Sequence, residues 1–212
     1  MNAHCNSMPQ VTDELEQLIL REIILRARSS MPTCALDLRC GEGLLSVNMA
    51  ELGATVLAAD APEFSGPVKN RARTAGVSGE VRFTPIKTLP EDLPPGPIDL
   101  AFCHHGISCL PYAEARQTLR VILKSLRIGG KLFLSAYGLH SALGENYAAA
   151  GAPVERRFCK LTPALAKCYN IHDAVCLYSE RDLVTLLFEV GGSVLRSFTT
   201  THGTVKAVAV RV

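Results

Sequence analysis

Two aspartates and two glycines are spaced as in a nucleoside-binding site. Asp37 lies within a short apolar run, Gly41 and Gly43 follow it closely, and Asp60 comes seventeen residues after Gly43. Glycines let a ligand approach the backbone without a Cβ in the way. A helix that starts at such a turn presents free N–H groups and a positive dipole end. Because a carboxylate at the tip of the next strand can bind both hydroxyls of a ribose, the pattern predicts a site for a nucleoside-bearing cofactor.

Two adjacent histidines are the candidates for a general base. His104 and His105 follow the apolar run 98–103, which is predicted to be a buried strand. Histidine titrates near neutral pH, so either side chain could accept a proton from a substrate there. The alternative is a structural role, in which a histidine at a strand tip only hydrogen-bonds the backbone. Both interpretations stay open on the sequence.

Alternating strands and helices are expected to position these residues. Short apolar runs predict strands at 34–38, 55–59, 81–84, 98–103 and 131–137. Apolar spacing and capping residues predict helices at 11–28 with Thr12 as N-cap, 44–52, 64–75 with Gly66-Pro67 delaying its start, 113–127, and 179–190 with Ser179 as N-cap. This rhythm predicts an α/β fold with a parallel sheet covered on both faces. Two last strands, 193–199 and 204–211, are expected to form an antiparallel hairpin around His202-Gly203.

The segment 138–177 interrupts the rhythm and is longer than an ordinary connection, so it is predicted to be a lid insertion. Polar and aromatic residues in it, or just before it, are the candidates for contact with a substrate: Tyr137, His140, Tyr147, Arg156 and Arg157. The two arginines could bind an anionic substrate. The alternatives are packing of the aromatic rings within the lid and a solvated loop for the arginines.

Composition narrows the class of protein. The 212 residues, 48% of them apolar, suit one domain over residues 1–212, with 1–31 as an N-terminal helical segment. The net charge of +2 comes without a basic stripe, so no nucleic-acid partner is expected. No signal sequence and no long apolar span are recognised, which predicts a cytoplasmic protein without a membrane partner. The eight cysteines contain no C-x-x-C, so neither a metal site nor a redox pair is expected.

The segment 36–43, Leu-Asp-Leu-Arg-Cys-Gly-Glu-Gly, resembles the first motif of the class I Rossmann-like S-adenosylmethionine-dependent methyltransferases, commonly written Asp-x-Gly-x-Gly-x-Gly. The resemblance extends over roughly residues 32–212. Segment 98–104 is similar to the family's fourth strand, and 126–132 to its Leu-Lys-Pro-Gly-Gly-x-Leu turn. The resemblance implies a doubly wound, mostly parallel sheet of seven strands with an antiparallel C-terminal hairpin. It also implies S-adenosylmethionine as the cofactor. The insertion and the tail are similar to bacterial small-molecule enzymes.

The resemblance also implies a set of cofactor-binding residues. Asp37 would orient the methionine ammonium, Asp60 would hold the ribose, and the turn 39–43 would line the carboxylate end. The full set is Asp37, Arg39, Cys40, Gly41, Gly43, Asp60, Ala61, Lys87, Thr88, Cys103 and His104.

Two residues depart from the family pattern and bear on cofactor affinity. Arg39 stands where the family has glycine or another small residue, so its side chain is expected to point away from the cofactor. Lys87 stands near the acidic residue that many members use for the adenine amine. A lysine cannot accept that hydrogen bond, so Thr88 or apolar contacts would have to replace it.

The function expected is in-line methyl transfer to a small-molecule acceptor. The alternatives are a binding protein that kept the fold without turnover, and a protein or RNA methyltransferase, for which no recruiting domain is recognised. A nicotinamide site would need G-x-G-x-x-G, whereas this chain has Ser46 at the third position. Asp37 and the terminal hairpin favour methyl transfer over that reading. The acceptor and the oligomeric state, monomer or homodimer, stay open.

Overall fold

A single seven-stranded sheet forms the centre of the computed structural model, which describes residues 13–212. Its strand order is β3-β2-β1-β4-β5-β9-β8, and every neighbouring pair is parallel except that β9 runs antiparallel to β5 and to β8. The strands are β1 (Cys34–Leu38), β2 (Thr55–Asp60), β3 (Val81–Pro85), β4 (Ile98–His104), β5 (Leu126–Ala136), β8 (Gly192–Thr199) and β9 (Val205–Arg211). The predicted Rossmann-like fold with its C-terminal hairpin is confirmed.

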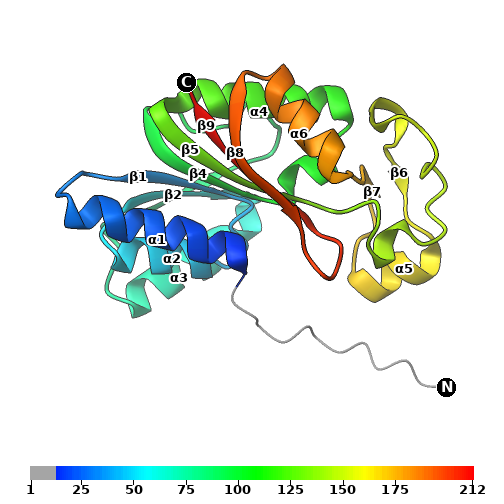
Figure 1. The fold of residues 1–212 in the computed structure, drawn as a ribbon. Helices are drawn as coiled ribbons and strands as arrows, with labels where there is room; N and C mark the ends of the chain where they lie inside the picture. The colour runs from blue at the N-terminus through cyan, green and yellow to red at the C-terminus, as the bar shows by residue number, and fades with distance from the viewer. Residues whose placement is uncertain (1–12) are drawn as a thin grey trace.

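Helices cover both faces of this sheet (Figure 1). One face carries α1 (Glu14–Arg28), α2 (Leu44–Glu51) and α3 (Ser65–Thr74), and the other carries α4 (Tyr112–Ser125) and α6 (Glu180–Glu189). With both faces covered, β1 and β4 are buried along almost their whole length, as their continuous apolar sequences require. Among residues 13–212, no helix is long and apolar enough to cross a membrane.

The reversal of strand order lies between β1 and β4. Strands β2 and β3 extend the sheet from β1 in one direction, and β5, β9 and β8 extend it from β4 in the other. In an open sheet of this kind, the carboxyl ends of the two central strands border a crevice in which ligands bind. Asp37 and His104 lie near the carboxyl ends of β1 and β4, so the fold places them beside this crevice.

The first helix is held onto the sheet by charged groups. Asp13 is its N-cap and accepts a hydrogen bond from the Leu15 amide at 2.8 Å. The same carboxylate pairs at 2.8 Å with Lys206, a buried lysine of β9. The predicted N-cap, Thr12, and the predicted first residue, Val11, lie outside the described residues.

Two predicted boundaries are wrong, one for a local reason and one because of pairing with a distant strand. Helix α3 begins at Ser65 without delay, because Pro67 lies in the first turn, where backbone N–H groups have no partner within the helix. Strand β5 begins at Leu126 rather than at 131, and α4 ends one residue before it. Leu126 is buried and pairs with Ile98, and the register then shifts before regular pairing resumes at Lys131.

The insertion 138–177 is a small unit beyond the carboxyl end of β5 (Figure 1). Its elements are the 3₁₀ helices η3 (Ala142–Gly144) and η4 (Val154–Arg156), strand β6 (Cys159–Lys160), helix α5 (Pro163–Tyr169) and strand β7 (Ala174–Val175). Strands β6 and β7 pair antiparallel. A separate apolar cluster holds the unit together, with the buried members Leu143, Tyr147, Leu161, Val175 and Leu177.

Candidate functional site

The glycine turn joins β1 to α2 and needs glycine at two positions. Gly41 has φ +54° and Gly43 has φ +80°, both in the left-handed region that side chains disfavour. A Cβ on Gly43 would also lie 3.0 Å from the side chain of Val68 in α3. The turn therefore brings its backbone tightly over the end of β1 while α3 packs against it.

The carboxylate of Asp60 is held against this turn from the end of β2. Its Oδ2 accepts a hydrogen bond from the Gly41 amide at 2.8 Å, and its Oδ1 accepts one from the Ala61 amide at 2.8 Å. The Asp60 side chain is only 6% exposed. Because each carboxylate oxygen can accept a second hydrogen bond, the group keeps acceptor capacity for a ligand.

Asp37 supplies a second carboxylate below the turn. It is buried in β1, and its Oδ2 accepts a hydrogen bond from the Ser46 hydroxyl at 2.6 Å. Burial raises the pKa of this carboxyl to about 7, opposed by the Ser46 hydrogen bond and reinforced by the charges of Glu16 and Asp60. Asp37 is thus poised between its neutral and charged forms near pH 7, and a ligand cation beside it would favour the charged form.

A hollow of about 220 Å³ opens beside the glycine turn and Asp37, and we call it the glycine-turn hollow. It is lined by Glu16, Asp37, Arg39, Cys40, Glu42, Leu44, Leu45, Arg71, Phe102 and His104. Four of the predicted cofactor residues meet there, from β1, the turn and β4. Glu16 and Arg71 were not predicted, since only packing of α1 and α3 against the sheet brings them to the turn.

The structure corrects the expectation that Arg39 points away from the cofactor site. Its guanidinium Nη1 lies 4.0 Å from Asp60 Oδ1, and its Nη2 lies 3.6 Å from the sulfur of Cys109. The Arg39 backbone is left-handed, with φ +65°, which directs the side chain across the tip of β4. The cation thus lies beside the carboxylate that was expected to bind the ribose.

Seven predicted cofactor residues do not line this hollow: Gly41, Gly43, Asp60, Ala61, Lys87, Thr88 and Cys103. The Lys87 and Thr88 amides both donate to the Asp92 carboxylate at 2.8 Å, so this segment is folded back on itself. It nevertheless follows Ile86, whose amide donates to the Asp60 carbonyl at 2.7 Å. Cys103 is buried under the tip of β4, and burial raises the pKa of its thiol to about 12. Its thiol is therefore an unreactive apolar group at neutral pH.

The two histidines face different sides of the site. Their rings meet edge to face with centroids 4.2 Å apart. His104 lines the glycine-turn hollow, and its Nδ1 lies 3.4 Å from the Ser135 hydroxyl. His105 lines a second hollow on the side of the insertion. Burial lowers the pKa of both imidazoles, that of His105 well below its usual value, so His105 is neutral at pH 7.

The second hollow, which we call the insertion hollow, measures about 400 Å³. It is lined by His105, Tyr137, Gly138, His140, Ser141, Ala142, Leu143, Tyr169, Thr201, His202 and Thr204. The rings of His105 and Tyr137 stack with centroids 4.4 Å apart and an angle of 19°. Nδ1 of His105 is buried and has no hydrogen-bond partner among residues 13–212. Tyr137 and His140 were predicted to lie near a substrate, whereas Tyr169 and His202 were not.

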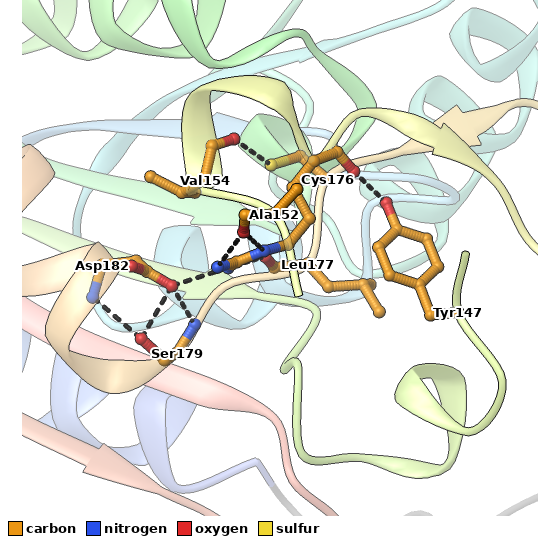
Figure 2. Close-up of polar contacts among 8 residues, drawn as sticks. Tyr147, Ala152, Val154, Cys176, Leu177, Ser179 and Asp182 are labelled. Atoms are coloured by element: carbon orange, nitrogen blue, oxygen red, sulfur yellow. Dashed lines mark hydrogen bonds and ion pairs between the residues drawn. The ribbon is translucent and has the colours of Figure 1, made fainter. Parts of the chain in front are cut away.

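Tyr147 and Arg157 have structural roles, which corrects their assignment as substrate residues. The Tyr147 hydroxyl lies within hydrogen-bond distance of the carbonyl oxygens of Arg157 and Val175 and can donate to one of them at a time. The Arg157 guanidinium is buried, pairs with Asp182 at 2.7 Å, and donates to the Leu177 carbonyl at 2.8 Å. Figure 2 shows this network, in which the carbonyls of Ala152 and Leu177 and the Ser179–Asp182 capping box of α6 lie together.

Both side chains are buried and form hydrogen bonds with backbone carbonyls of the insertion. Arg156 lines neither hollow, so its predicted contact with a substrate has no support in the geometry.

The glycine turn with its Asp60 carboxylate, together with the hollow beside the turn, fits a nucleoside with a cationic tail. A carboxylate at the β2 tip with spare acceptor capacity suits a ribose diol, and a buried carboxyl with a pKa near 7 suits an ammonium group. The glycine turn leaves open space over Gly41, where a Cβ would meet nothing within 4 Å. No group of three or more histidine, cysteine or acidic side chains within residues 13–212 could hold a metal ion.

Comparison with known sequences links this site to methyl transfer. A family described as "Methyltransferase domain" matches residues 35–130. The ubiquinone biosynthesis O-methyltransferase of Xanthomonas euvesicatoria is 38% identical over 101 residues, which are 47% of this chain and 41% of the relative. The enzyme of the same description from Xanthomonas campestris strain B100 is 34% identical over 111 residues, 51% of this chain and 45% of the relative. The matches thus span less than half the length of these relatives.

Solved structures share the fold over most of the chain. The magnesium protoporphyrin IX methyltransferase of Synechocystis PCC 6803, solved with bound SAH, has a TM-score of 0.67 at 19% identity and covers 100% of this chain and 90% of its own. A SAM-dependent methyltransferase of Methanosarcina mazei has a TM-score of 0.64 at 18% identity and covers 85% and 93%. At these identities the likeness establishes the fold.

Proposed function

We propose that the chain is a class I S-adenosylmethionine-dependent methyltransferase and that it methylates a hydroxyl group of a small molecule. The observation that carries the proposal is the Asp60 carboxylate, held by the Gly41 amide at the switch point of the sheet. The curated relatives support an oxygen acceptor, since they are O-methyltransferases.

Three contacts of the cofactor follow from the glycine turn and the hollow beside it. Asp60 binds the ribose hydroxyls, Asp37 binds the ammonium of the methionine end, and the Gly41 backbone lies against the same end. Lys87 and Thr88 would hold the adenine. They follow directly after Ile86, whose amide donates to the Asp60 carbonyl. When bound, S-adenosylmethionine supplies a methyl group that is already activated by its attachment to a sulfonium.

The protein then has to align the acceptor and remove its proton. Alignment alone can contribute about 7–11 kcal/mol to lowering the barrier. His105 would accept the proton of the acceptor hydroxyl, and S-adenosylmethionine would supply the methyl group when bound. The lowered pKa of His105 keeps the imidazole neutral and able to accept that proton. His104 lies between the two hollows and positions His105 through their edge-to-face contact.

The acceptor occupies the insertion hollow. Its wall combines the stacked rings of His105 and Tyr137 with polar side chains such as His140, which suits a flat hydroxylated ring. The insertion 138–177 supplies most of this wall and acts as the lid of a catalytic domain that spans residues 1–212. The volume of about 400 Å³ is of the size that small-molecule sites have.

A second candidate function is cofactor binding without turnover. The observation that motivates it is the Arg39 guanidinium, 4.0 Å from Asp60, because this departure from the family pattern would weaken cofactor binding and so limit turnover. The two functions differ in one measurement. A methyltransferase converts S-adenosylmethionine and an acceptor such as catechol to products, whereas a binding protein only binds the cofactor.

Calorimetry with S-adenosylhomocysteine tests the proposal directly. The change Asp60→Ala removes two ribose hydrogen bonds to a charged group, and we expect it to weaken binding about 10- to 100-fold. The control is Glu63→Ala, which removes an exposed carboxylate of η1 (Pro62–Phe64) just beyond the site and should leave the affinity unchanged. An Asp60→Ala protein that binds as tightly as the wild type would contradict the placement of the ribose. A wild type that does not bind at millimolar concentration would contradict the function.

A further inference from the structure

Arg39 has a backbone conformation that its side chain disfavours. Its φ of +65° is left-handed, and residues other than glycine, asparagine and aspartate are uncommon there. The resemblance to the Asp-x-Gly-x-Gly-x-Gly motif places a glycine at this position in the family. Non-glycine residues keep such conformations only where the surrounding structure holds them, and they concentrate at binding sites.

The side chain of Arg39 crosses the site from the β1 tip to the β4 tip. A Cβ placed on Gly106, after β4, would lie 3.2 Å from Arg39 Cγ and 3.0 Å from the Cys103 sulfur, so the glycine makes room for the arginine stem. The guanidinium then lies between Asp60, at 4.0 Å, and Cys109, at 3.6 Å. The side chain is 43% exposed, so it can swing outward into solvent.

We propose that Arg39 sets the cofactor affinity by competing with the ribose for the Asp60 carboxylate. The inference rests on the proposed function, because it takes Asp60 as the ribose ligand. Each oxygen of Asp60 already accepts one backbone N–H, from Gly41 and from Ala61. The remaining acceptor capacity faces either the guanidinium or the ribose hydroxyls, so the arginine has to move aside when the cofactor binds.

If Arg39 has the opposite role, a different effect on cofactor affinity is expected. A guanidinium in this hollow could bind the carboxylate of the methionine end, and it would then strengthen cofactor binding instead of weakening it. Adenosine separates the two roles, because it has the ribose but lacks the methionine end. It is also uncharged, so salt can change its affinity only through ion pairs of the protein itself.

The experiment is calorimetry of S-adenosylhomocysteine and of adenosine with the wild type, Arg39→Ala and Arg39→Gly. We expect both variants to bind both ligands about two- to fivefold more tightly than the wild type, as expected for the loss of one partly exposed ion pair. The control is Arg116→Ala, because Arg116 pairs with Glu189 at 3.7 Å and is 46% exposed, far from the hollow in α4. Its affinities should equal those of the wild type.

Two further measurements sharpen the test. Raising the salt concentration about tenfold should tighten adenosine binding to the wild type and leave Arg39→Ala unchanged, because salt screens the competing pair. In an Asp60→Asn protein, the additional change Arg39→Ala should have no effect on affinity. Arg39→Gly keeps the test valid if alanine is poorly tolerated, because glycine suits the left-handed backbone.

The inference is overturned if the Arg39 variants bind adenosine no more tightly than the wild type. Weaker binding of S-adenosylhomocysteine with unchanged binding of adenosine would also overturn it, and would assign Arg39 to the methionine end. Both results leave the proposed function standing. Failure of every protein, the wild type included, to bind either ligand would instead overturn the proposed function.

Discussion

The two hollows at the carboxyl edge of the sheet are built in different ways. The glycine-turn hollow takes most of its wall from one continuous piece of chain, 37–45, held between β1 and α2. The insertion hollow is assembled from four separate pieces: His105, the segment 137–143, Tyr169 and the hairpin turn 201–204. His104 of the glycine-turn hollow and His105 of the insertion hollow are in contact with each other.

This difference indicates which of the two hollows suits the cofactor and which suits the acceptor. A strand and a helix on both sides of the glycine turn make a rigid cradle, which suits a cofactor that is always the same. A wall made of an insertion with its own small core can be changed without disturbing the sheet, which suits the acceptor. Changes in one hollow should therefore leave the other largely intact.

The largest expected effect is a loss of turnover caused by a change in the insertion hollow alone. The change His105→Asn removes the proposed base and should lower turnover with S-adenosylmethionine and catechol about 10²- to 10⁴-fold. The affinity for S-adenosylhomocysteine should stay within the error of the wild-type value. The control is His172→Asn, an exposed histidine of the insertion that hydrogen-bonds Asn170. Equal turnover of wild type and His105→Asn would remove His105 as the base.

The next effect concerns the anchoring of the insertion. The change Arg157→Met leaves Asp182 without its buried partner and two backbone carbonyls without donors, which should lower the free energy of unfolding by about 3–5 kcal/mol. Urea denaturation measures this loss, and hydrogen exchange should show it first within 138–177. Arg156→Met, which changes the exposed neighbour, should have almost no effect. Equal losses for the two variants would contradict the structural role of Arg157.

The pH dependence of cofactor binding tests the glycine-turn hollow in the same comparison. The pKa of Asp37 is raised to about 7, so the carboxyl is mostly protonated below that pH and cannot attract an ammonium group. The affinity for S-adenosylhomocysteine should therefore fall as the pH drops through 7, by up to about tenfold per pH unit, and should level off above it. In Asp37→Asn this slope should disappear. A wild-type affinity that is constant between about pH 5 and 8 would argue against contact between Asp37 and the ammonium.

The smallest expected effect is a difference in stability that comes from backbone strain in the glycine turn. Arg39→Gly and Arg39→Ala both remove the guanidinium, but only glycine suits a φ of +65°. Arg39→Gly should therefore be the more stable of the two by about 1 kcal/mol, despite the greater flexibility of glycine in the unfolded chain. Thermal or urea unfolding of the pair measures the difference. Equal stabilities would mean that the turn relaxes out of the left-handed conformation.

Much of the fold and of the first hollow was contained in local sequence patterns. Short apolar runs and glycine positions depend on neighbours along the chain, so the parallel sheet, the glycine turn and the places of Asp37 and Asp60 were predicted correctly. The capping box at Ser179 is local in the same sense. The start of β5 was predicted wrongly because it depends on pairing with a distant strand, between Leu126 and Ile98.

Side-chain direction was decided only by the tertiary structure. Arg39 turns toward Asp60 because the end of β2 lies beside the end of β1, and Arg157 is buried because Asp182 of α6 and the Leu177 carbonyl lie beside it. The division of His104 and His105 between two hollows likewise depends on where the insertion and the hairpin come together. A sequence determines which groups a chain carries and its local periodicity, whereas burial and the charges of distant residues determine where a long polar side chain finds its partner.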